Sequence, residues 1–141
     1  MAEVTIADTW VYATLKADAT LTALIGGSSA PRIYRGMAPK DAVFPCVVFF
    51  YQPGGRDVRG VGTVNIMING SWVIKAIDRA TSASSAATIA ARMYSLLHGQ
   101  KGTVTGGAVL ACTREEPIAY VELLDGAQYQ HVGGVYQIYL Q

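Results

Sequence analysis

The chain has 141 residues, of which 51% are hydrophobic and 15% charged, and its formal net charge is +1. This length fits one domain that buries about 70% of its unfolded surface, so the core needs no disulfide or metal. The small net charge argues against a protein that holds nucleic acid by a broad basic surface, and the apolar content argues against disorder. Low charge together with eight tyrosines favours burial of surface between subunits.

The chain carries no recognisable membrane or export signal. No apolar run reaches the ~20 residues needed to cross a bilayer. The first residues, Met-Ala-Glu-Val-Thr, lack the basic and apolar regions of a signal peptide. Cys46 and Cys112 lie far apart in apolar runs, without a Cys-x-x-Cys pair or clustered histidines, so we predict two reduced core residues. We therefore expect a cytoplasmic protein with no metal and no cofactor.

The first third of the chain predicts two helices, a short strand and a loop. The first helix is expected to end at about Ala17, and Asp18 to cap a second, shorter helix that ends at Gly26-Gly27. Residues 32–34 predict a short strand. Residues 36–44 predict a loop, because the prolines in and after it block helix formation.

The next segment predicts a buried strand followed by a flexible arm. Residues 46–52 are almost entirely apolar, which is typical of an inner strand. Residues 53–62 contain four glycines together with Arg56 and Arg59, so they predict a mobile loop. A plain hairpin closes in two to five residues, and we expect this longer arm to become ordered on a partner. The predicted interface residues are Gly54, Gly55, Arg56, Asp57, Val58, Arg59 and Gly60.

The chain is organised around residues 63–99, where strand formers pass directly into a small-residue helix. Asn69-Gly70 is either the turn of a two-residue hairpin or a kink in one long strand. The helix, expected over 83–97, has one apolar stripe of Ala86, Ala90, Met93 and Leu97. Its candidate caps are Asp78, Thr81 or Ser82 at the start and His98-Gly99 at the end.

The last third of the chain predicts strands separated by loops. Residues 100–107 are polar and predict a loop, and residues 108–115 predict a strand. Residues 117–125 are ambiguous, and a last strand is expected over 135–141, after a flexible Gly133-Gly134. The whole order predicts an α+β fold: a mostly antiparallel sheet with helices packed on one face and an extended loop between two long strands.

The sequence predicts no catalytic, cofactor-binding or metal site. His98 is expected to act as a cation at a helix end and His131 as a loop or rim residue. Ser82, Ser84 and Ser85 lack the spacing of the serine-enzyme motifs. The glycine-rich arm is not followed by the helix and Gly-Lys-Ser/Thr of a phosphate loop. Glu115-Glu116 is better explained as a solvated face, because adjacent strand residues point to opposite sides.

The order, identity and spacing of six segments resemble the siphophage tail terminator family, also called tail completion proteins or minor tail proteins of the head-tail neck. The resemblance covers nearly the whole chain. Residues near Ala76 to Ser84 look inserted relative to the family. In the family pattern the stretch through Asn69-Gly70 is one long strand, and we adopt this alternative. The matching segments are Leu15–Gly26, Arg32–Tyr34, Phe44–Phe49, the strand at Trp72, Leu97–Gly99 and Gly134–Ile138.

This resemblance implies a structural virion protein that forms a ring, usually of six subunits. The ring would end polymerisation of the tail tube and join the tail to the head connector. The implied partners are the tail tube protein and a connector or neck protein, and genome DNA would pass through the lumen without sequence-specific binding. No reaction and no membrane is implied, and the protein would assemble in the host cytoplasm. The alternatives are a neck head-closure or adaptor protein, and a small-ligand-binding or enzyme domain with an unrecognised pocket.

Overall fold

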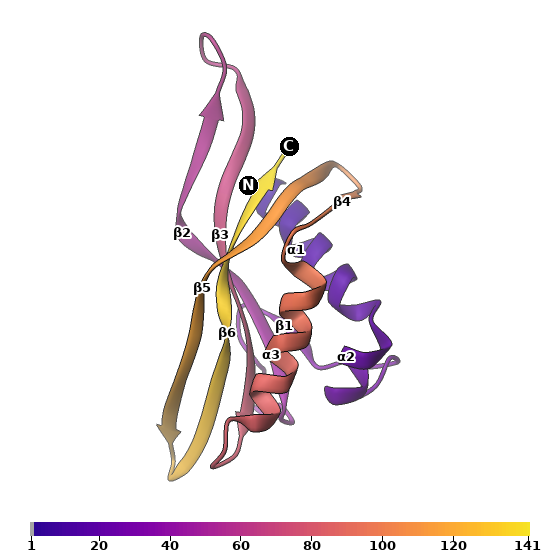
Figure 1. Ribbon diagram of the computed structural model, residues 1–141, viewed down its shortest axis with the longest axis vertical. Coiled ribbons are helices and arrows are strands. Elements are labelled where there is room, and N and C mark those ends of the chain that lie inside the picture. Colours follow the sequence, from indigo (N-terminus) through magenta and orange to yellow (C-terminus); the bar gives the residue numbers. More distant parts are fainter. Residues whose placement is uncertain (1) are drawn as a thin grey trace.

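The computed structural model describes residues 2–141, in which six strands form one curled sheet with helices beside it (Figure 1). The helices are α1 (Ala2–Lys16), α2 (Ala19–Leu24) and α3 (Ser84–Leu97). The strands are β1 (Ile33–Arg35), β2 (Cys46–Arg59), β3 (Asn65–Arg79), β4 (Gln100–Val104), β5 (Gly107–Leu124) and β6 (Ala127–Leu140). None of the helices described is long and apolar enough to cross a membrane.

The sheet has the strand order β1-β2-β3-β6-β5-β4. Only β1 and β2 are parallel, and every other neighbouring pair is antiparallel. The β2–β3 hairpin and the β5–β6 hairpin extend to opposite ends of the molecule (Figure 1). The predicted α+β fold with a mostly antiparallel sheet is therefore confirmed.

The core lies between the helices and one face of the sheet. Trp72 and Ile74 from β3 and Tyr136 and Ile138 from β6 pack in one buried cluster with residues of all three helices. The predicted apolar stripe of α3 belongs to this cluster, because Ala86, Ala90, Met93 and Leu97 are all buried. A smaller cluster of Cys46, Val48 and Ile77 lies apart from it. The helices thus cover one face, as predicted.

The short helix α2 begins at the predicted cap. The Asp18 carboxylate accepts a hydrogen bond from the Leu21 backbone N–H at 2.8 Å. The same carboxylate receives two hydrogen bonds from the Arg92 guanidinium, at 2.8 and 2.7 Å. Arg92 lowers the pKa of Asp18, and the Leu21 N–H acts in the same direction. One carboxylate therefore starts α2 and ties it to α3.

The start of α3 differs from the prediction. The residue at the N-cap position is Ala83, which has no side chain that can accept a hydrogen bond. Of the three candidates, Ser82 contributes, because its Oγ accepts from the Ser84 N–H at 3.3 Å. The helix ends as expected at His98, and Gly99 follows with a φ of +76°.

The last third of the chain contains more strand than predicted. Residues 100–104 form β4 and pair with β5. Residues 107–124, which include the ambiguous stretch around Pro117, form one continuous strand with two irregularities. Gly133-Gly134 lies in the middle of β6 and is not a flexible lead-in. A Cβ atom at Gly133 would collide with the Ile74 carbonyl and the Lys75 backbone, so glycine here permits close approach of two strands.

Asn69-Gly70 lies within β3, so the long-strand alternative is correct and the two-residue hairpin is not. Gly70 pairs with Ile138 of β6 and is buried. A Cβ atom at Gly70 would lie 2.5 Å from the Trp72 ring. The glycine therefore makes room for the buried indole rather than for a turn.

Candidate interaction surface

The predicted arm is the outer half of a long β-hairpin, not a mobile loop. Residues 53–59 belong to β2 and pair with β3 as far as Arg59, which faces Asn65. The pairing shifts between Gln52 and Arg56, where Gly54 has a φ of +120°. Glycines in a strand can mark such a bulge as well as a loop, which is why the sequence was misleading here.

The predicted interface residues are brought together on this hairpin. Gly54 and Gly55 lie at the bulge, Arg56 to Arg59 continue the strand, and Gly60 begins the closing turn, where its N–H bonds the Val64 carbonyl at 2.8 Å. Gly55 lies against the strand opposite, because a Cβ atom there would be 3.1 Å from the Asn69 carbonyl oxygen. The base of the hairpin is anchored by an edge-on contact of the Tyr51 and Trp72 rings.

The tip of the β2–β3 hairpin is both apolar and exposed. Val61 is fully exposed, Val64 is 68% exposed and Ile66 is 48% exposed. Arg56 and Arg59 lie just below them, and neither forms an ion pair within residues 2–141. Apolar side chains beside unpaired cations are typical of a protein-binding surface.

A second exposed apolar group lies at the opposite end of the molecule, on β5. Tyr120, Val121, Leu123 and Leu124 are all exposed, with Leu123 at 72%. The sequence pattern contained the signal for this group, since apolar residues alternate imperfectly across 117–125. An imperfect alternation indicates a strand with no fully buried face.

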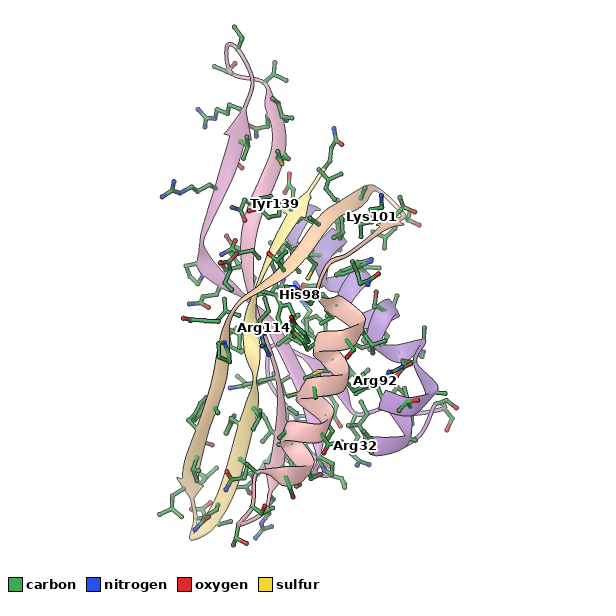
Figure 2. The ribbon with its side chains drawn as sticks, in the orientation of Figure 1. Arg32, Arg92, His98, Lys101, Arg114 and Tyr139 are labelled. Carbon is green, nitrogen blue, oxygen red and sulfur yellow. The ribbon has the colours of Figure 1, made fainter. Side chains whose placement is uncertain are left out.

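The two histidines take part in contacts between elements of the fold. His98 Nδ1 accepts a hydrogen bond from the Arg114 N–H at 3.0 Å, so His98 joins the end of α3 to β5 (Figure 2). His98 therefore acts as a hydrogen-bond acceptor at the end of α3. His131 is buried in β6 rather than at a rim, and its ring stacks on Tyr120 at 4.4 Å. Within residues 2–141, neither ring is hydrogen-bonded to a serine, threonine or cysteine.

The cysteines are buried free thiols, as predicted. Burial raises the pKa of Cys46 to about 11 and that of Cys112 to about 12. A thiol with such a pKa is almost entirely protonated at neutral pH, and the thiolate is the nucleophilic form. Both residues therefore serve packing rather than chemistry.

Sequence reasoning missed one buried polar group, Asp8. Its Oδ1 accepts a hydrogen bond from Trp72 Nε1 at 3.0 Å, and its Oδ2 forms an ion pair with the exposed Arg35. Oδ2 receives no well-aligned hydrogen bond. Burial raises the pKa of Asp8, although the Trp72 bond and the Arg35 charge oppose this. A helical aspartate among apolar residues would have been the only sequence signal.

The hollows beside the hairpin are shallow. One of about 370 Å³ is lined by Glu3, Tyr51, Arg56 and their neighbours, and one of about 220 Å³ by Glu3, Ile66, Leu140 and others. Within residues 2–141, no group of three or more histidine, cysteine or acidic side chains could hold a metal ion.

The described residues form an α+β fold with one curled sheet and exposed apolar side chains on its two long hairpins. A family model described as "Tail completion protein gp17" matches residues 9–119. The chain belongs to this tail completion family and is a structural phage tail protein.

A solved structure has a fold similar to that of this chain. The chain is 21% identical to a chain of the "Virion of native gene transfer agent (GTA) particle", with a TM-score of 0.69. The match covers 92% of this chain and 90% of that chain. At this identity the likeness establishes the shared architecture. A search of curated proteins gave no match.

Proposed function

We propose that this chain acts as a single structural unit that assembles into a ring, usually of six copies, at the end of the phage tail. The ring stops growth of the tail tube and joins the tail to the head connector. Genome DNA passes through its lumen without sequence-specific contacts. Assembly takes place in the host cytoplasm, and the ring stays in the virion.

Family membership carries this proposal, and the surface is consistent with it. A subunit between a tube and a connector needs binding surfaces on two sides. The apolar tips of the β2–β3 and β5–β6 hairpins extend to opposite ends of the molecule (Figure 1). The residues Gly54 to Gly60 belong to the first of these surfaces, and we assign them to contact with a neighbouring subunit or tail protein.

Shortening the β2–β3 hairpin tests this role. Gln52 pairs with Ser71, so an Asn-Gly turn in place of residues 53–70 closes a two-residue hairpin without changing the register of the remaining strands. We expect the shortened subunit to remain folded with a lower melting temperature, because Ile68 leaves its contact with the core and residues 68–70 leave their pairing with β6. Electron microscopy should show rings for the native chain and none for the shortened one. When phage that lack the native gene are supplied with either the native or the shortened protein, only the native protein should restore complete tails.

Normal tail completion by a shortened protein would contradict the role of the hairpin. Purified native protein that stays monomeric at every concentration, even with tail tube protein added, would contradict the ring itself.

A further inference from the structure

Two long stretches of the sheet have a neighbour on one side only. On β5, pairing with β4 ends at Cys112, so residues 113–124 pair with β6 alone among residues 2–141. On β2, pairing with β1 ends at Phe49, so residues 50–59 pair with β3 alone in the same described range. The Arg114 N–H already donates to His98 Nδ1, and the β2 stretch contains Pro53 and the irregularity between Gln52 and Arg56. Outside these positions each stretch presents backbone N–H and C=O groups that can pair with another strand.

The β5 stretch has little protection against pairing. Natural edge strands are usually blocked by lysines, prolines or bulges. Residues 113–124 contain no lysine, and they carry one proline, Pro117, and one irregularity, near Arg114. The exposed Tyr120, Val121, Leu123 and Leu124 lie on the same stretch. An apolar, weakly protected edge of this length needs a partner to cover it.

The strand directions indicate which edge can cover it. Along β2-β3-β6-β5 each strand is antiparallel to the next, so β5 runs opposite to β2. Copies in a ring are related by rotation about an axis that is tilted relative to the strands by less than 90°, and this rotation preserves the direction of each strand along the axis. The β5 edge of one copy would therefore meet the β2 edge of the next in antiparallel orientation, and the sheet would continue with the pattern that it already has.

Charge favours the same pair of edges. Glu115 and Glu116 are exposed on the β5 stretch, whereas Arg56 and Arg59 are exposed on the β2 stretch. Counted residue by residue, the antiparallel register that opposes residues 50–59 to residues 115–124 places Arg59 opposite Glu115. Registers shifted by one or two residues place Asp57 opposite Glu116 or Glu115, so charge favours the first register.

The two edges lie at different heights of the sheet, and strand tilt can compensate for this. Reading the pairings across the sheet places Thr113 level with Gln52 and Tyr120 level with Cys46. The neighbour must therefore be displaced along the strands by several residues. Strands that close into a barrel are tilted by about 35–45° and are staggered for this reason.

We propose that neighbouring copies join by strand addition, in which residues 115–124 of one copy pair with residues 50–59 of the next and Glu115 faces Arg59. This inference rests on the proposed ring and specifies its contact. The contact is head-to-tail, so each copy uses one edge of each kind and the sheets join into one continuous surface.

Charge reversal in two variants tests the pairing. The first variant carries Arg56→Glu and Arg59→Glu, and the second carries Glu115→Lys and Glu116→Lys. Each variant alone would oppose like charges at every contact, so light scattering should show at least a tenfold loss of assembled protein. A 1:1 mixture can alternate the two variants, which restores opposite charges at every contact, and assembly should return. A control with Lys40→Glu and Lys101→Glu makes the same change in net charge as the first variant, at residues outside both stretches, and should assemble normally.

The outcomes separate this inference from the proposed ring. Circular dichroism first shows that each variant is folded. Suppose that the native protein forms rings. If each single variant also assembles, or if the mixture does not recover assembly, the strand pairing is wrong and the proposed ring still holds. Native protein that does not assemble at all would overturn the ring and the pairing with it.

Discussion

Several single residues in this chain either leave space for a neighbouring residue in the sheet or accept its hydrogen bond. Gly70 and Gly133 are glycines because a Cβ atom would strike the Trp72 ring or the backbone of β3. Asp8 is present in the core because the buried Trp72 N–H needs an acceptor. These roles depend on contacts between distant parts of the chain, so no local pattern could have predicted them.

The Asp8 carboxylate gives a prediction with opposite outcomes for two substitutions. Asp8→Ala leaves the buried Trp72 N–H without an acceptor and should lower the free energy of unfolding by about 1–3 kcal/mol. Asp8→Asn keeps an oxygen acceptor and removes a buried charge. Because the pKa of Asp8 is raised in the folded state, its contribution to stability is present at low pH and is lost as the pH rises through that pKa.

Asp8→Asn should therefore be at least as stable as the native protein at pH 7, and the difference should shrink toward pH 4. Urea unfolding at both pH values measures this. A loss of stability in Asp8→Asn as large as in Asp8→Ala would show that the Arg35 ion pair, not the Trp72 hydrogen bond, is the important contact.

At the scale of elements, the β5–β6 hairpin combines an exposed apolar edge with a buried histidine. His131 stacks on Tyr120, whose hydroxyl accepts a hydrogen bond from Lys75 Nζ at 2.6 Å. Burial lowers the pKa of His131, and the Lys75 charge lowers it further, whereas Glu122 raises it. The folded hairpin therefore resists protonation of this ring.

This resistance predicts a pH-dependent stability. Below the ordinary histidine pKa of about 6.5, the unfolded chain binds a proton that the folded chain does not, so His131 lowers the free energy of unfolding as the pH falls from 7 toward 5. His131→Phe keeps a flat ring against Tyr120 and cannot titrate. Thermal melts at pH 7, 6 and 5 should show a smaller loss for His131→Phe than for the native chain. Parallel losses would mean that His131 titrates as it does in the unfolded chain.

The helices were predictable from the sequence and several strands were not, for a physical reason. The buried face of a helix can be predicted from local sequence, through periodic residues such as Ala86, Ala90 and Met93. The start of a helix can be predicted from a cap such as Asp18. Strands β4 and β5 are polar or exposed over much of their length, so alternation is weak. Gly133-Gly134 and the glycines of β2 have the composition of loops, yet close strand contact and a bulge explain them.

At the scale of the whole molecule, the sequence indicated a need for partners but not the surfaces that meet them. Low charge and high apolar content predicted association. The edges that remain open after the sheet forms are a property of topology, because β1 and β4 are each too short to cover the strand beside them. That residues 54–60 form an interface stays a prediction, although they lie in a strand and its turn and not in a loop, and the β5 edge was not predicted.

Association should be weakened by salt. The proposed contact pairs exposed charges, which are screened over about 10 Å at 0.1 M salt and about 3 Å at 1 M. Light scattering behind a sizing column should give several times 15.0 kDa at low salt and a smaller mass at 1 M salt. An assembled mass that rises with salt would indicate that apolar contacts alone hold the subunits together.

The opposite directions of the two hairpins determine how the molecule carries a mechanical load. A pull between the β2–β3 tip and the β5–β6 tip passes from β3 to β6, which are paired along twelve positions from Ile68–Leu140 to Arg79–Tyr129. The force runs along these strands, so the hydrogen bonds between them are sheared together and are not opened one after another. Such a subunit can transmit tension from one end to the other along its strands, the direction in which the sheet resists force best.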